Sequence, residues 1–108
     1  MIEDVEYKLE KFNDDLKSLF ITVRNIIFEV EPLIEERLWA SLPSYYKDKN
    51  FIRLIPFKTY INIEAKAISL HIDELNDYQI TPKGMMKIFV NQPIPYKVLK
   101  MIFIETLQ

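Results

Sequence analysis

The hydrophobic residues of this chain change their spacing shortly after Pro32, and this change limits the folds available to it. Before Pro32, apolar residues recur every three or four positions, which is the period of a helix with one buried face. From Arg37 onward, apolar and polar residues alternate, as they do in strands that bury one face of a sheet. Helices followed by alternating strands are typical of an α+β protein.

The N-terminal helical pattern contains a natural break. The apolar positions that share one helical face are Val5, Leu9, Phe12, Leu16, Leu19, Val23, Ile26 and Val30. One long helix would satisfy this spacing, but Asn13 is a favourable N-cap residue, so we predict two helices that meet there. The second helix should end at Glu31, because a residue that precedes a proline avoids the helical conformation.

Strands are predicted over residues 37–42, 51–55 and 60–64, where β-branched, aromatic and alternating residues are concentrated. Pro43 is expected to end the first of these strands, and residues 47–50 are expected to form a turn. If the alternation is correct, the apolar members of each strand face the helices and the others face away.

Residues 65–75 predict a short helix, and a further strand is expected over residues 84–90. Pro95 suits the first turn of a last helix. The apolar residues that share a face of the short helix are Ile68, Ile72 and Leu75. The predicted fold class is therefore α+β: an antiparallel sheet of about four to five strands, with the N-terminal helices, one middle helix and a C-terminal helix packed mainly on one face.

Composition excludes several functional classes. The chain of 108 residues suits a single domain, 1–108, and it has no cysteine and one glycine. Disulfides, iron–sulfur clusters and thiol nucleophiles are therefore excluded. A phosphate-binding loop, a dinucleotide fingerprint and a nucleophile elbow are excluded as well, because each needs several glycines. We expect a protein that is not an enzyme.

The charge and the N-terminus bear on location and partners. The net charge is −2, with ten acidic and four basic residues in positions 1–36 and six acidic and ten basic residues in positions 37–108. Without a basic cluster, we expect no nucleic acid partner. The first residues are acidic and no apolar stretch is long enough to span a bilayer, so we expect no membrane partner and a cytoplasmic location.

Several short segments, spread along most of the chain, occur in an order that matches the pattern of a known family. They are Leu38-Trp39-Ala40-Ser41-Leu42-Pro43-Ser44-Tyr45, Phe57-Lys58-Thr59-Tyr60-Ile61, Lys83-Gly84 with Phe89, and Pro93-Ile94-Pro95 with Val98-Leu99. In this order they resemble the YdhG-like family of small bacterial domains of unknown function. The chain departs from the family pattern at Tyr60, where a histidine is frequent.

The resemblance implies two N-terminal helices with a break between them, which agrees with the break at Asn13. It implies no activity and no catalytic residues. Some members of the family are labelled frataxin-like iron chaperones, so the resemblance makes iron a conceivable cargo.

One candidate site is a set of aromatic, cationic and amide side chains that alternate with the helix-facing residues of the strands. They are Arg37, Trp39, Arg53, Tyr60, Asn62, Lys87 and Phe89. Aromatic walls with cationic and amide donors suit a small anionic or aromatic ligand. The same mixture is also typical of a dimer interface, and Trp39 and Phe89 could instead belong to the core.

The second candidate is an acidic stripe. Glu6, Glu10 and Asp14 are spaced four apart, so on a continuous helix their carboxylates would align and could hold iron weakly. A helix break at Asn13 would misalign Asp14, and an ordinary solvated face is the alternative. The only histidine, His71, lacks enough neighbouring ligands to predict a metal site.

These observations favour an uncharacterised, non-enzymatic binding domain that uses an open sheet face for a small ligand or a protein partner and needs no cofactor. Two alternatives remain. One is an intracellular iron chaperone of the frataxin-like kind that uses the acidic N-terminal helix, and the other is a purely structural module that forms a homodimer.

Overall fold

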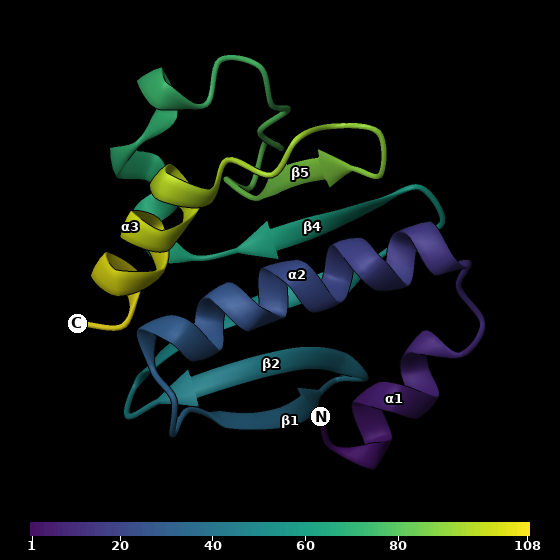
Figure 1. Cartoon of the computed structure of the whole chain (residues 1–108). Coiled ribbons are helices and arrows are strands. Elements are labelled where there is room, and N and C mark those ends of the chain that lie inside the picture. The colour runs from purple at the N-terminus through teal and green to yellow at the C-terminus, as the bar shows by residue number, and fades with distance from the viewer.

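The structure is a computed structural model that describes residues 1–108 (Figure 1). In chain order its elements are α1 (Glu3–Leu9), α2 (Asp14–Val30), β1 (Glu35–Trp39), β2 (Leu42–Lys47), β3 (Asn50–Pro56), β4 (Tyr60–Glu64), the 3-10 helices η1 (Lys66–Leu70) and η2 (Ile72–Glu74), β5 (Met86–Phe89) and α3 (Tyr96–Thr106).

The N-terminal helical segment is divided at the predicted residue. Asn13 caps α2, because its side-chain oxygen accepts a hydrogen bond from the backbone N–H of Leu16 at 2.9 Å. This bond satisfies one of the N–H groups that have no partner at the start of a helix. The helix ends at Val30, and Glu31 leaves the helical conformation directly before Pro32, as expected.

The five strands form one antiparallel sheet in the order β1-β2-β3-β4-β5, so each strand pairs with its neighbours in the sequence. The predicted fold class, an antiparallel α+β arrangement, is confirmed. The turn predicted at residues 47–50 is also present, since Lys47 pairs with Asn50 across a two-residue loop.

The first predicted strand, over residues 37–42, is wrong in its extent. The chain turns at Ala40 and Ser41, whose φ angles are 49° and 67°. A two-residue turn of type I′ requires positive φ at both central positions, which alanine and serine rarely adopt, so the sequence did not indicate the turn.

This hairpin changes the position of three residues. Pro43 does not end a strand but lies within β2, opposite Leu38. Leu42 lies opposite Trp39, and cross-strand partners project from the same side of a sheet. Leu42 is therefore not on the helix-facing side with Leu38, as the sequence had suggested.

The helices α2 and α3 cover one face of the sheet (Figure 1), and the core lies between them and the strands. The strand residues of this core are Tyr45, Ile52, Leu54, Ile61, Ile63, Met86 and Ile88. Val23 and Ile27 of α2 and Ile102 of α3 are fully buried opposite them. The other face of the sheet has no helix over it (Figure 1).

The middle helix takes the form of two 3-10 segments, η1 and η2, rather than one α-helix. The chain bends between them at His71, whose φ and ψ are −125° and 20°. Because of this bend, Ile68 and Leu75 are buried but Ile72 is 44% exposed, so the predicted common face of these residues is only partly correct.

The last strand begins at Met86, two residues after the position expected from Gly84. Gly84 instead ends a turn, where its φ of +87° suits a residue without a side chain. Pro95 is the N-cap of α3, close to its predicted place. None of the helices combines the length and the apolar character needed to cross a membrane.

Candidate functional site

The uncovered side of the sheet, which we call the open face, is formed by every second residue of the strands. The ladder of cross-strand pairs identifies its members, because paired residues project from the same side. Arg37 pairs with Ser44, Ser44 with Arg53, and Arg53 with Glu64.

The same reasoning extends to the last two strands. Tyr60 pairs with Phe89 and Asn62 pairs with Lys87, and both Tyr60 and Asn62 alternate with the buried residues of β4. The structure thus places all the residues predicted for a ligand or interface on the open face: Arg37, Trp39, Arg53, Tyr60, Asn62, Lys87 and Phe89.

Arg53 is the most connected residue of the open face. Its Nε donates to Ser44 Oγ at 3.1 Å, its Nη1 to Glu64 Oε1 at 3.0 Å and its Nη2 to Tyr46 Oη at 3.3 Å. Only 7% of the residue is exposed. Three hydrogen-bond partners on two flanking strands hold the guanidinium in one orientation.

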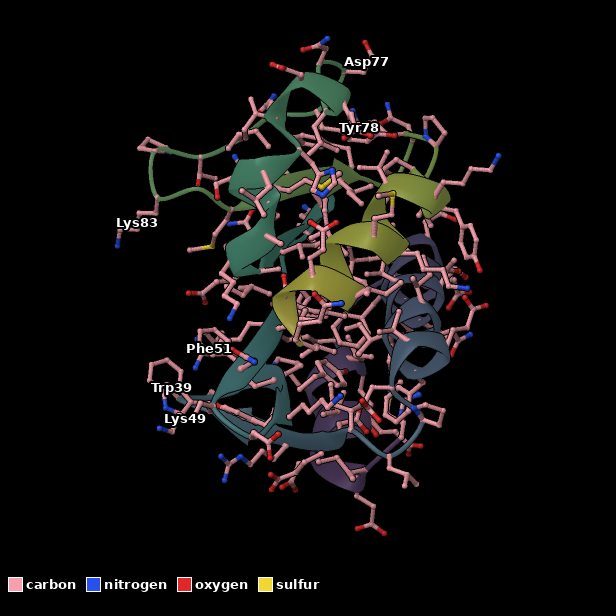
Figure 2. All side chains as sticks on the ribbon, turned by 90° about the vertical axis from the view of Figure 1, so that its left-hand side faces the viewer. Trp39, Lys49, Phe51, Asp77, Tyr78 and Lys83 are labelled. Atoms are coloured by element: carbon pink, nitrogen blue, oxygen red, sulfur yellow. The ribbon has the colours of Figure 1, made fainter.

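Two aromatic rings lie against the same guanidinium. The Cζ atom of Arg53 is 4.0 Å from the ring centroid of Trp39 and 4.0 Å from that of Phe51. Trp39 is 52% exposed, so it does not belong to the core. Figure 2 shows Trp39, Lys49 and Phe51 on the side of the sheet opposite α2. The result is a planar cation bordered by aromatic surface that water and solutes can reach.

A second aromatic group lies at the other end of the open face. The rings of Phe57 and Tyr60 are stacked with centroids 4.8 Å apart, and the centroids of Tyr60 and Phe89 are 5.0 Å apart. Lys87 Nζ is 4.6 Å from the Tyr60 centroid. Asn62 contributes less than expected, because its Oδ1 is buried without a hydrogen-bond partner and is not presented to solvent.

A cavity of about 280 Å³ opens beside the Arg53 group. It lies where the β2–β3 hairpin, the β4–η1 junction and the turn before β5 converge. Its lining residues are Lys49, Asn50, Phe51, Glu64, Ala65, Lys66, Ser69, Lys83 and Gly84. In Figure 2, Lys83 projects on the same side of the sheet as Lys49 and Phe51. The cavity therefore continues the open face and adds lysine side chains to it.

The acidic stripe predicted for iron does not form a site. The helix α1 ends at Leu9, so Glu6 lies within it, Glu10 lies at its end and Asp14 begins the next helix. The break at Asn13 rotates the two helices relative to one another, and no group of three or more histidine or carboxylate side chains is close enough to hold a metal ion. Glu6, Glu10 and Asp14 are therefore not aligned on one continuous helix, as expected if the helix breaks at Asn13.

His71 serves as a link between elements. It is buried, and its Nδ1 and Nε2 are 2.7 Å from Glu74 Oε1 and 2.8 Å from Glu105 Oε1 respectively. These hydrogen bonds, first that of Glu105 and then that of Glu74, raise the pKa of His71 above its ordinary value of 6.5. With both ring nitrogens occupied by carboxylates, the imidazole joins η2 to α3 and is not free to bind a metal ion.

Comparisons of the chain with protein family models, with curated proteins and with solved structures find no match. The resemblance to the YdhG-like family stays a prediction.

Sequence reasoning missed several members of the open face and its cavity. Tyr46 was missed because the hairpin at Ala40–Ser41 was not recognised, and without it β2 has no assigned register. Phe51 could have been found, since it is two residues from Arg53 on the same strand. Lys49, Lys66 and Lys83 lie in loops or at element ends that converge only in the folded chain. No periodic signal could have found these three lysines.

Proposed function

We propose that the protein is a non-enzymatic binding domain of the cytoplasm whose open sheet face binds a small ligand with a negative charge and a planar group. The observation that carries this proposal is Arg53, a buried guanidinium held by three hydrogen bonds between the exposed ring of Trp39 and the half-buried ring of Phe51. Preorganised cations and aromatic walls are what such a ligand needs.

Charge favours a ligand over a second copy of the chain. In a two-fold symmetric dimer each protomer presents the same surface to the other, so a surface with a net positive charge repels its copy. Arg37 and Lys87 project from the open face and Lys83 borders it, and self-association through that face would bring these positive charges together. A homodimer is therefore the competing outcome in the test below.

The proposal is tested with variants of the aromatic residues of the open face. A panel of small anions, with and without an aromatic ring, is screened by thermal shift against the full chain, because a ligand that binds only the native state raises its melting temperature. Trp39 and Tyr60 lie at opposite ends of the open face, so Trp39→Ala or Tyr60→Ala should abolish the stabilisation by a hit that binds at its own end, while both leave the far-ultraviolet circular dichroism unchanged. In the wild type, stabilisation by the anionic hits should decrease with added salt, and Arg53→Ala should abolish it.

Tyr7→Ala is the matched control, because Tyr7 is an aromatic residue of α1 that is 77% exposed. It should leave every ligand response unchanged. The proposal fails if Trp39→Ala unfolds the protein and no open-face variant alters ligand binding. It also fails if sedimentation shows a dimer that dissociates in Trp39→Ala, since the open face would then be an interface between protomers.

A further inference from the structure

The cavity beside Phe51 is built by three segments that are distant in the sequence. Lys49 comes from the loop between β2 and β3, Lys66 from the start of η1, and Lys83 from the turn before β5. A local sequence bias does not explain such a cluster, because each lysine is brought there by a different part of the fold. The cavity also has polar hydrogen-bonding groups from Asn50 and Ser69.

The positive charge around the cavity is not neutralised within the protein. None of Lys49, Lys66 and Lys83 lies within ion-pair distance of a carboxylate, although Lys47 and Lys100 elsewhere do. The only acidic residue that lines the cavity is Glu64, and its Oε1 is bonded to Arg53. An anion that entered the cavity would therefore meet an excess of positive charge.

Parts of the cavity wall are held in place by hydrogen bonds. Lys66 Nζ donates to Asn50 Oδ1 at 2.6 Å, and Asn50 Nδ2 donates to the backbone oxygen of Gln108 at 2.9 Å. The turn that carries Lys83 is closed by hydrogen bonds from the N–H of Gly84 and the N–H of Met85 to Thr81. Such support lowers the entropy lost when lysine side chains are ordered around a ligand.

The chemistry of the wall narrows the class of anion. Several lysines around one space suit a group with more than one negative charge, and a phosphate monoester carries about −1.5 to −2 at neutral pH. Phe51 adds an aromatic ring, which is held against the Arg53 guanidinium and can contact a planar group. The volume of about 280 Å³ is small for a binding pocket and excludes large cofactors.

We propose that this cavity binds a nucleoside monophosphate or a closely similar phosphorylated planar molecule. The phosphate is bound by Lys66 and Lys83, and the planar ring lies against Phe51. This inference rests on the proposed function and names the ligand class and the part of the open face that binds it.

The test uses the full chain labelled with ¹⁵N, titrated separately with adenosine monophosphate, ribose 5-phosphate, adenosine and inorganic phosphate. We expect adenosine monophosphate to shift the amide signals of residues 49–51, 64–69 and 83–84 and to bind more tightly than the other three probes. Lys66→Gln and Lys83→Gln should each weaken this binding about threefold to tenfold, the effect of losing one charged contact.

The control variant is Lys97→Gln, since Lys97 is an exposed lysine of α3 outside the cavity, and it should bind like the wild type. Phe51→Leu should reduce the affinity for adenosine monophosphate to that for ribose 5-phosphate. The inference would be overturned if Lys66→Gln and Lys83→Gln bound adenosine monophosphate as tightly as the wild type does. Equal binding of inorganic phosphate and adenosine monophosphate would overturn it as well.

Two further results separate this inference from the proposed function. If adenosine monophosphate shifts only the signals of Trp39, Tyr60 and Phe89, the cavity assignment is overturned while the open face remains a binding surface. If none of the four probes shifts any signal, the inference is overturned, and the anion panel decides the proposed function independently. If a single-stranded oligonucleotide of ten thymidines binds about a hundredfold more tightly than the monophosphate, the inference is overturned, because the partner is then nucleic acid and not a small ligand.

Discussion

The two faces of the sheet are made from alternating residues of the same strands, yet they differ in burial and in the chemical type of their side chains. Ile61 and Ile63 of β4 are fully buried beneath the helices, whereas Tyr60 and Asn62 on the same strand face away from them. The helix side is mainly apolar, with the ion pair of Arg24 and Glu36 as a polar exception, and the open face is mainly aromatic and cationic.

The two faces therefore contribute differently to the stability of the fold. Burial of aliphatic side chains stabilises the fold in proportion to the area removed from water, and the helix side supplies that burial. The open face makes cation–π contacts and ion pairs that contribute little to stability when they are exposed to solvent. Substitutions on the two sides should therefore have different consequences, and the contrast can be measured strand by strand.

The largest contrast is expected between neighbouring residues of β4. Ile61→Ala should reduce the free energy of unfolding by about 2–5 kcal/mol, because it leaves a cavity in a fully buried site. Tyr60→Ala, on the same strand but on the open face, should cost about 0.5–1.5 kcal/mol. Chemical denaturation of both variants provides the comparison, and equal losses would show that the open face belongs to the core.

A smaller contrast is expected between the ion pairs of the two faces. Arg24 Nη2 donates to Glu36 Oε1 at 3.0 Å on the helix side, and the exposed fraction of the Glu36 side chain is 5%. Glu64, which pairs with Arg53, has a side chain that is 37% exposed. Glu36→Gln should destabilise the protein by about 1–3 kcal/mol and Glu64→Gln by less, because solvent reaches the Glu64 carboxylate although Arg53 is buried.

The pH dependence of Glu36 provides a check. Burial by itself would raise the pKa of Glu36, but the hydrogen bonds from Arg24 and from the backbone N–H of Ile2 outweigh it and hold the pKa below its ordinary value of 4.5. The carboxylate therefore stabilises the fold above pH 4.5, and this contribution is lost as the pH falls through the lowered pKa. A stability difference between wild type and Glu36→Gln that persists unchanged in strong acid would contradict this pairing.

The fold could largely be predicted because its signals are local. The cap at Asn13 and the alternation of Ile61 and Ile63 with polar neighbours are each visible within a few residues. The hairpin at Ala40–Ser41 could not be predicted, because positive φ angles at these residues are imposed by the pairing of β1 and β2 and not by local preference.

Only those residues of the candidate site that alternate along a strand could be predicted from the sequence. Alternation placed Trp39 and Arg53 on one face, but their contact depends on the order of the strands. The cavity lysines come from three connecting segments whose proximity is a property of the whole fold, and the bend at His71 depends on a contact with Glu105, 34 residues away.

The smallest effect concerns His71. Its pKa is raised by hydrogen bonds to Glu105 and Glu74, so the protonated form stabilises the native state. A raised pKa gives a contribution that is fully present below the unfolded value of about 6.5 and is lost as the pH rises through the folded value. His71→Gln should therefore be less stable than wild type by less than about 1 kcal/mol below that value, and the difference should shrink with increasing pH.

Thermal unfolding at a series of pH values measures this difference. A gap between wild type and His71→Gln that grows as the pH rises would show that the neutral imidazole is the stabilising form. Glu74→Gln provides a milder comparison, because it removes the second of the two carboxylate partners and leaves Glu105 in place.

The most direct test of the open face uses the single tryptophan of the chain as a fluorescent probe. Trp39 is half exposed and lies against Arg53, so iodide should quench its emission efficiently, and the ratio of quenching by iodide to quenching by caesium should exceed that of free N-acetyltryptophanamide. The preference for the anion should decrease in high salt and in Arg53→Ala. If Trp39 is shielded from both ions in the native protein, a second protomer or the core covers this face, and it is not an open surface for an anionic ligand.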